Sequence, residues 1–258
     1  MPGEAAPPPA GAGSGAEPVR RLVAEYRIRF DEANPRNVLR TSAYLAFVQD
    51  CAWRHSTVLG LDRAWYAARE LFWLVRAVDL HIVREAATYE PLAVSTEVIA
   101  MRRVWALRHS EIRDAAGELL ATADIDWVMT NLRGVPARIP VEILGLFPVP
   151  DRFEPNRVEL PPSPVDAAQL ELEVRRLDLD PMAHVNNTRY LDYLEEAVAA
   201  AGDDAALTAV PRRYRLEYLA SAAPGARLRG VTWPAADGRA FRLLGADGSE
   251  LLRAWLTR

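Results

Sequence analysis

The sequence lacks several features that mark particular classes of protein. It contains one cysteine, Cys51, in 258 residues, so no disulfide can form within the chain. No run of about 18 apolar residues occurs, which is the length that crosses a membrane as a helix. We therefore expect no membrane span, and a reducing cytoplasm is the simplest location for a chain with a lone thiol.

Histidine and surplus positive charge are also scarce. The chain has 4 histidines, and its 31 Lys and Arg against 35 Asp and Glu give a formal net charge of −4. This balance argues against a strongly basic nucleic-acid binder, and no Cys and His residues have the spacing of a zinc site. We expect no metal, no other cofactor and no nucleic-acid partner.

The composition that is present suits a packed core. Half of the residues are apolar, enough for one or two domains. Residues 1–18 are the exception, because they are mostly Ala, Pro and Gly and cannot bury enough apolar surface to fold. They lack the basic start and apolar run of a signal peptide and the Arg and Ser enrichment of a transit peptide. We predict that they form a disordered tail.

The first part of the remaining chain changes from strand-like to helix-like patterns. Residues 19–30 predict a strand, and apolar residues at helical spacing predict a helix over 42–59, capped by Ser42 and ended by Gly60. After a second short helical piece, the patterns predict four strands, at 71–83, 92–103, 105–113 and 119–131. The Pro-rich segment 133–168 predicts a linker with a helical patch.

The second part repeats this order of elements. We predict a strand over 170–178 and a helix over 187–201. Strand patterns follow at 214–220, 227–233, 240–244 and 250–256. Asp237-Gly238 and Asp247-Gly248 supply hairpin turns. Each half therefore predicts an α+β unit, in which an antiparallel sheet wraps one long helix.

A polar turn joins the predicted strand and helix of the second part. Asp178 and Asp180 end the strand, and His184, Asn186 and Asn187 precede the helix. A carboxylate that activates water, an imidazole, and the N–H groups of a helix start that bind an oxyanion are the parts of a catalytic site. The alternative is a polar turn with an Asn helix cap.

A weaker copy of this turn and helix occurs at residues 30–52. When the Tyr-Leu pairs of the two helices are aligned, Asn34 falls on Asp180 and Val38 falls on His184. The spacing of the copies is too long for a solenoid and indicates a duplicated domain. Any chemistry therefore belongs to the second copy, and the first is freer to bind.

The turn Asp-x-Asp-x-x-x-His-Val-Asn-Asn, placed before a helix with Tyr-Leu and Glu, resembles that of hotdog-fold thioesterases. Two such units in one chain look like the acyl-acyl carrier protein (acyl-ACP) thioesterases of plants and bacteria. The Trp-containing strand at 71–76, the strand Trp-Val-Met-x-Asn at 127–131 and the exit Arg-Ile-Pro-x-Glu at 138–142 resemble the same family. The resemblance covers residues from about 20 to 258.

The resemblance implies two tandem hotdog folds. Residues 19–132 form an N-terminal hotdog that binds the acyl chain, 133–168 a linker, and 169–258 a catalytic C-terminal hotdog. The implied reaction is hydrolysis of the acyl-ACP thioester to free fatty acid, with an acyl carrier protein presenting its acyl-phosphopantetheine group. Alternatives are an acyl-CoA or polyketide-chain thioesterase, or a non-catalytic acyl-binding double hotdog, and a homodimer is possible.

The chain also departs from the plant pattern. Met182 stands where the plant enzymes have an Asn, and Ser221-Ala222 stands where they have a Glu-Cys pair. A Cys-His-Asn nucleophilic mechanism is therefore not available at that place. The turn instead matches simpler hotdog thioesterases, in which an Asp and a His remain.

The resemblance assigns roles to the polar residues of the turn. Asp180 is the general base that activates water, or the direct nucleophile, and His184 orients or polarises the site. Asn186 and Asn187 cap the helix or point an amide at the carbonyl. For Asp180 the alternative is a turn residue that accepts backbone N–H groups, and for His184 it is a core histidine.

Five further residues are predicted to meet the substrate. Val48, Cys51 and His55 lie on the apolar stripe of the first helix and line the acyl tunnel that the resemblance implies, together with Trp73 on the following strand. Ser221 holds a water. A Cys51–His55 dyad is conceivable at this spacing, but core packing is the simpler interpretation.

Five arginines begin two strands of the second half and suggest a basic rim. These are Arg212, Arg213, Arg215, Arg227 and Arg229. Such a rim would steer an acidic carrier protein by long-range attraction. The alternative is that they form the solvated faces of ordinary strands.

Overall fold

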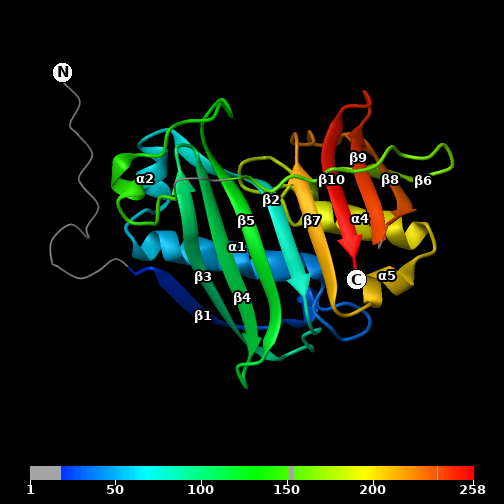
Figure 1. Ribbon diagram of the computed structural model, residues 1–258, viewed down its shortest axis with the longest axis horizontal. Coiled ribbons are helices and arrows are strands. Elements are labelled where there is room, and N and C mark those ends of the chain that lie inside the picture. Colours follow the sequence, from blue (N-terminus) through cyan, green and yellow to red (C-terminus); the bar gives the residue numbers. More distant parts are fainter. Residues whose placement is uncertain (1–18, 151–153, 237) are drawn as a thin grey trace.

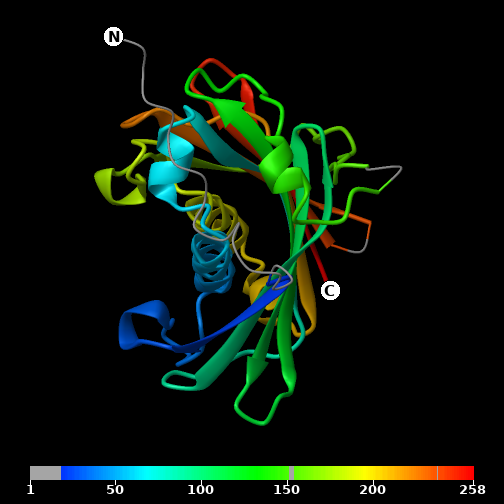
Figure 2. The same cartoon turned by 90° about the vertical axis from the view of Figure 1, so that its left-hand side faces the viewer.

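A computed structural model of the protein describes residues 19–150, 154–236 and 238–258. Ten strands form one antiparallel sheet in the order β1-β3-β4-β5-β2-β7-β10-β9-β8-β6 (Figure 1). The sheet curves around the two long helices, α1 and α4, which lie on its concave side (Figure 2). The predicted tail at 1–18 and the turn at Asp237 fall outside the described residues.

The first half contains a long helix and five strands. Its elements are β1 (Arg21–Arg27), a 3-10 helix (Phe30–Glu32), α1 (Thr41–Val58), α2 (Arg63–Ala67), β2 (Leu71–Ile82), β3 (Pro91–Arg102), β4 (Trp105–Asp114) and β5 (Leu119–Asn131). Alternating buried and less buried residues along β4 show the period of two expected for a sheet with one covered face.

The second half repeats this plan after a connecting segment that carries α3 (Val141–Leu144). Its elements are β6 (Ala168–Glu173), a 3-10 helix (Arg176–Asp178), α4 (Arg189–Ala200), α5 (Asp204–Thr208), β7 (Arg212–Tyr218), β8 (Arg227–Ala235), β9 (Gly238–Gly245) and β10 (Glu250–Thr257). The predicted α+β class is confirmed. No helix of the described segments is long and apolar enough to cross a membrane.

The two halves share one sheet and one core. Antiparallel pairing of β2 with β7 runs from Ala77 opposite Glu217 to Ile82 opposite Arg212. The Tyr-Leu pair of α1 and that of α4 belong to the same apolar cluster, in which each of the four side chains is at most 2% exposed. The fold therefore depends on both copies of the repeat.

Three details of the sequence prediction are wrong. The strand predicted to reach residue 178 ends at Glu173, because the backbone N–H of Arg175 donates to Asp178 and closes a 3-10 turn. Ser42 does not cap α1, since Arg40 holds that position and no side chain caps the end. The apolar stripe predicted for the helix at 42–59 includes Val58, whose side chain is instead 56% exposed and lies on a side of α1 away from the core.

The segment that joins the halves crosses the outer face of the sheet from β5 to β10. The backbone N–H and side chain of Asn156 donate to Asp126 on β5. The backbone N–H of Val158 donates to Glu217 on β7 at 3.0 Å, and the Trp255 ring N–H of β10 donates to a carbonyl of this segment at 2.9 Å. The segment is thus fixed to both halves by hydrogen bonds.

We predict that Asp126→Asn stabilises the protein at neutral pH. Asp126 is fully buried, and burial raises its pKa to about 6. Because this pKa lies above that of an unfolded chain, the favourable contribution is present below about pH 4 and is lost as the pH rises through about 6. The amide keeps an acceptor for Asn156, so the free energy of unfolding should rise by about 1–3 kcal/mol at pH 7.5.

Urea unfolding of both proteins at pH 7.5 and near pH 4 measures this effect. The difference should nearly vanish at the lower pH, where the wild-type carboxyl is protonated. An Asn variant that is less stable at pH 7.5, or equally shifted at both pH values, would contradict the prediction.

Candidate functional site

The turn between the second 3-10 helix and α4 is closed by its own backbone and by Asp180. The N–H of Asp180 donates to the carbonyl of His184 at 2.8 Å, and Ala183 adopts φ 60°. The Oδ1 atom of Asp180 accepts the N–H groups of Met182 at 2.8 Å and His184 at 3.1 Å. One carboxylate oxygen is therefore committed to the turn, and Oδ2 makes no hydrogen bond to the described part of the chain.

The side chain of Asp178 fixes the segment that leads into this turn. It is fully buried and accepts hydrogen bonds from the Arg175 guanidinium at 2.9 Å and the Tyr193 hydroxyl at 2.9 Å. Burial acts to raise the pKa of Asp178, but these donors outweigh burial and hold it below its usual value. Asp178 is a structural anchor that does not share a strand face with Asp180, because the strand ends before it.

The two asparagines have different environments. Asn186 Oδ1 accepts the N–H of Thr188 at 3.0 Å and its hydroxyl at 2.9 Å, so this amide oxygen orders the approach to α4. The carbonyl of Asn187 accepts the Tyr218 hydroxyl at 2.9 Å, which fixes its backbone. The Asn187 side chain has no hydrogen-bond partner among the described residues, so its amide is available to a ligand.

The same turn exists in the first half with different chemistry. Asn34 Oδ1 accepts the N–H groups of Arg36 at 2.9 Å and Val38 at 3.5 Å, and Asn37 adopts φ 59°. An amide oxygen is therefore sufficient to close the turn. What Asp180 adds over Asn34 is the negative charge and a second oxygen.

The residues predicted to act with Asp180 do not all form hydrogen bonds among the described residues. His184 is exposed, and its imidazole makes no hydrogen bond among the described residues. The Tyr190 hydroxyl accepts the N–H of Ala222 at 3.1 Å. Burial raises the pKa of Tyr190, hydrogen bonds from Ala222 and Ser221 lower it, and the charge of Asp180 raises it again. Ser221 and Asp180 thus both act on the same hydroxyl.

The predicted substrate residues of the first half lie apart from this turn. Val48, Cys51 and His55 are all fully buried on α1. Cys51 Sγ donates to the carbonyl of Val94 at 3.4 Å and makes no bond to His55, so no thiol–imidazole dyad forms. Trp73, half-buried on β2, donates its ring N–H to the Tyr66 hydroxyl at 3.0 Å and belongs to a second apolar cluster.

Gln49 is a residue that the sequence prediction did not single out. Its counterpart in α4 is Glu195, which accepts the Tyr214 hydroxyl at 2.6 Å and interacts with Thr41, the first residue of α1. The internal repeat therefore predicts that Gln49 faces the start of α4, because Thr41 aligns with Asn187. The Nε2 atom of Gln49 is buried and has no partner among the described residues. The alignment of the two copies in the sequence is the signal that could identify Gln49.

The predicted basic rim is largely wrong. Arg212 is 2% exposed and pairs with Glu85 at 2.9 Å. Arg213 forms two 2.6 Å contacts with Asp79, and Arg215 approaches the same carboxylate at 3.9 Å. All three arginines are thus paired with carboxylates, which reduces the positive charge that they offer to a carrier, although the side chains of Arg213 and Arg215 remain partly exposed. Of the five arginines, only Arg227 and Arg229, which no ion pair among the described residues engages, are left for that role.

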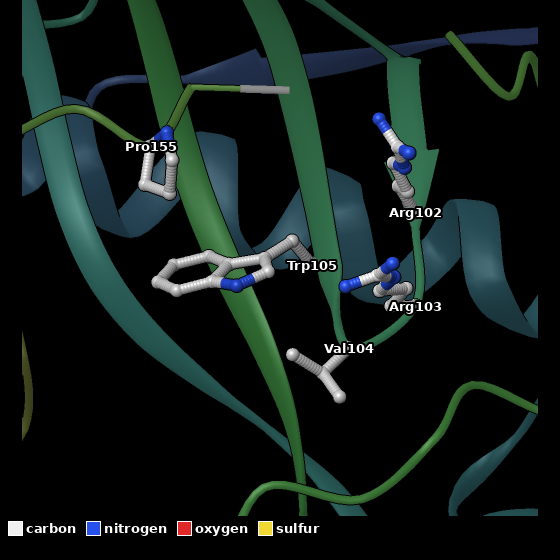
Figure 3. Close-up of a pocket in the computed structure, with 5 residues that line it drawn as sticks. All are labelled: Arg102, Arg103, Val104, Trp105 and Pro155. Carbon is white, nitrogen blue, oxygen red and sulfur yellow. The ribbon is translucent and has the colours of Figure 1, made fainter. Parts of the chain in front are cut away.

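A pocket of about 450 Å³ lies in the first half, at the turn between β3 and β4 (Figure 3). It is lined by Arg102, Arg103, Val104, Trp105 and Pro155. None of these residues belongs to the Asp180 turn. The chemistry of the turn, not the presence of this pocket, therefore identifies the candidate site.

Known protein families match the chain in the order of its two halves. The acyl-ACP thioesterase N-terminal domain matches residues 21–147, and the acyl-ACP thioesterase C-terminal domain matches residues 163–243. The chain belongs to the acyl-ACP thioesterase family. The resemblance seen in the sequence motifs is confirmed.

Individual relatives in plants agree with this assignment. A palmitoyl-acyl carrier protein thioesterase, chloroplastic, from Gossypium hirsutum is 27% identical over 213 residues, which cover 74% of this chain and 51% of that protein. An oleoyl-acyl carrier protein thioesterase 2, chloroplastic, from Arabidopsis thaliana is 28% identical over 171 residues, covering 58% and 47%. The chain spans about half the length of these curated relatives.

Solved structures of the family share the fold. An acyl-ACP thioesterase from Bacteroides thetaiotaomicron superposes with a TM-score of 0.78 at 17% identity, covering 92% of this chain and 97% of that one. A 12:0-ACP thioesterase from Umbellularia californica gives 0.75 at 24% identity, covering 92% and 96%. The predicted pair of hotdog folds is confirmed.

We predict that the Cys51 thiol is unreactive in the folded protein. Burial raises the pKa of Cys51 to about 11, and the thiolate is the reactive form. At pH 8 only about one thiol in a thousand would be ionised, even with free access. Titration with a thiol-specific disulfide reagent should therefore be slow in the folded state.

Unfolded protein in denaturant is the control and should release one equivalent at once, since the chain has a single cysteine. Rapid stoichiometric reaction of the folded protein would show that Cys51 is accessible and ionised, and would bring back a thiol mechanism.

Proposed function

We propose that the protein hydrolyses the thioester of acyl-ACP and releases a free fatty acid. The observation that carries the proposal is the second oxygen of Asp180. The turn needs only one oxygen acceptor, as Asn34 demonstrates in the first half. A charged residue with an uncommitted oxygen, placed next to a helix start in a chain of this family, fits a general base.

In the proposed reaction, Asp180 Oδ2 takes a proton from water while the water oxygen attacks the thioester carbonyl carbon. The N–H groups at the start of α4 and the amides of Asn187 and Gln49 donate to the carbonyl oxygen as it becomes negative. The carbon–sulfur bond then breaks, and protonated Asp180 returns the proton to the leaving thiolate. His184, on the same turn, polarises or orients the reacting group.

The first half binds the acyl chain in this proposal, and the second performs the chemistry. We place the acyl-binding half at residues 19–132, the linker at 133–168 and the catalytic half at 169–258. Val48 and Cys51 supply buried apolar surface on α1, and each methylene group transferred from water contributes about 0.8 kcal/mol. His55 and Trp73 line the same half, while Ser221 holds a water near Tyr190.

We propose an acyl carrier protein as the partner, because the plant relatives are named for acyl carrier protein substrates. Hydrolysis of acyl-CoA or a polyketide chain, or acyl binding without turnover, are the alternative outcomes of the test. A cytoplasmic location and a homodimer also remain predictions, and the named plant relatives are chloroplastic.

We predict that Asp180→Asn folds normally and loses roughly 10²- to 10⁴-fold in kcat, because the amide closes the turn but cannot take a proton. The assay measures release of fatty acid from acyl-ACP and from acyl-CoA over a series of chain lengths. Asn34→Asp is the matched control and should leave activity near wild type, since the first turn lacks the histidine.

An Asp180→Asn protein with more than about half of the wild-type rate would remove Asp180 as the base. Wild-type protein that binds acyl-ACP without hydrolysing it would favour the acyl-binding alternative. A higher kcat/KM for acyl-CoA than for acyl-ACP would change the carrier.

We predict that Val48→Phe shifts the preference toward shorter acyl chains. The larger side chain fills space in the first half, so long chains should lose kcat/KM while the best short substrate keeps its kcat. Leu194→Phe, an equally buried position on α4, is the control and should reduce activity on all lengths alike. A shifted profile from Leu194→Phe with none from Val48→Phe would reverse the roles of the two halves.

A further inference from the structure

An arginine lies inside the acyl-binding half, where apolar side chains are expected. Arg108 is on β4 at a position that faces α1, in line with Ala106, Ser110 and Ile112, and its side chain is only 7% exposed. In the register of the sheet it is opposite Val98, and two positions away Ser110 is opposite Thr96. A polar patch thus interrupts the covered face of the first sheet.

The partners of Arg108 are all neutral. Its Nη1 contacts His55 Nδ1 at 2.9 Å and Thr96 Oγ1 at 3.2 Å. Burial lowers the pKa of His55, and the charge of Arg108 lowers it further. The neutral imidazole accepts at Nδ1, because the guanidinium can only donate. Nε2 therefore carries the proton and donates to the carbonyl of Val19 at 2.7 Å.

No carboxylate of the described residues lies within 4 Å of this guanidinium, and its hydrogen bonds to these residues are the two made by Nη1. Other buried arginines of the chain differ, since Arg212 pairs with Glu85 at 2.9 Å and Arg239 with Asp203 at 3.1 Å. Burial lowers the pKa of Arg108 only to about 10, so it stays charged at pH 7. An unpaired buried charge costs several kcal/mol.

The surroundings connect this cation to the predicted acyl-binding surface. His55, its direct partner, lies one helical turn after Cys51 on the buried side of α1. Val94 and Ile112, which lie opposite each other in the row next to the polar patch, belong to the same apolar cluster as Val48 and Cys51. An acyl chain that enters along this side of α1 would therefore run from apolar surface to Nε and Nη2 of the guanidinium, which together carry three N–H groups.

We propose that Arg108 binds an oxygen atom of the acyl chain at a position far from the thioester. The substrate class is an oxygenated acyl group, of which a terminal carboxylate is the best match to a planar guanidinium, and a hydroxyl or keto oxygen offers the same acceptor chemistry without charge. This inference rests on the proposed function for the thioester end of the substrate. It assigns a binding role to Arg108 and a positioning role to His55, which holds one side of the guanidinium.

The first test compares acyl-ACP substrates of equal length that carry a plain, an ω-hydroxyl or an ω-carboxyl end. Wild type should prefer an oxygenated end by roughly 10- to 100-fold in kcat/KM, as expected for one charge-assisted hydrogen bond. Arg108→Met should lose that preference while keeping or gaining activity on the plain chain. Comparison of the ω-hydroxyl and ω-carboxyl substrates distinguishes a neutral from a charged oxygen.

Two further variants control for folding and charge. Arg113→Met removes a half-buried arginine from the same strand, where it pairs with Glu111, and should leave the preference unchanged. If the Met variant does not fold, Arg108→Lys takes its place, because lysine keeps the positive charge. This variant should weaken the ω-carboxyl preference without abolishing it. A wild-type enzyme that prefers plain chains, or an Arg108 variant that loses all substrates equally, would overturn the inference.

A binding measurement separates this inference from the proposed function. Free α,ω-dicarboxylic acids should raise the Tm of the wild type more than monocarboxylic acids of the same lengths, and Arg108→Met should remove the difference. This result would support the site even if the protein hydrolyses no thioester. Equal stabilisation by both acids in wild type would contradict it, whatever the hydrolysis assay shows.

Discussion

The antiparallel pairing of β2 with β7 is the constraint on which the rest of the structure depends. Without it, each half would expose the edge of its sheet, with unpaired N–H and C=O groups. Pairing of residues 77–82 with 212–217 makes one sheet and brings α1 and α4 into a common core. It also couples the second half to the turn of the first, because Arg212 of β7 pairs with Glu85, which in turn pairs with Arg36 of that turn. The first turn is therefore held by a contact that the first half alone does not have.

The two turns show how one local geometry supports two kinds of chemistry. In both, a side-chain oxygen accepts two backbone N–H groups, a residue with positive φ completes the turn, and a tyrosine of the following helix accepts a backbone N–H from a loop. These bonds need oxygen acceptors and do not need a charge. The carboxylate of Asp180 is therefore in excess of what the turn requires, whereas Asn34 meets the requirement alone. The same argument makes Asp178 structural, because Oδ1 accepts from Arg175 and Oδ2 accepts from both Arg175 and Tyr193.

Much of the fold and part of the site follow from the sequence, for identifiable reasons. Alternation and helical spacing report burial directly, so the helices and most strands of both halves are correct within a few residues. The predicted end of β6 lies too far along the chain. The apolar alternation continues past Glu173, but a local hydrogen bond from Arg175 to Asp178 ends the strand there. The basic rim was wrong because its partners, Asp79 and Glu85, are distant in sequence and meet the arginines only through the β2–β7 pairing. The role of His184 depends on the direction in which its side chain points, and the spacing of apolar residues along the sequence does not predict that direction.

Arg108 is a second example of a residue whose surroundings could not be predicted from the sequence. The alternation of residues 105–113 places it on the covered face, but its partners, His55 and Thr96, come from α1 and β3, so its neutral environment is visible only in the folded chain. A methionine or leucine at this position would pack against α1 without the cost of a buried cation. If the first half served only plain alkyl chains, hydrogen bonds from Nε and Nη2 to a ligand would not offset this cost. The arginine and the uncommitted oxygen of Asp180 lie in different halves. In the reaction proposed above they act at the two ends of one substrate: Asp180 activates the water that attacks the thioester carbonyl, and Arg108 donates to an oxygen acceptor at the far end of the acyl chain.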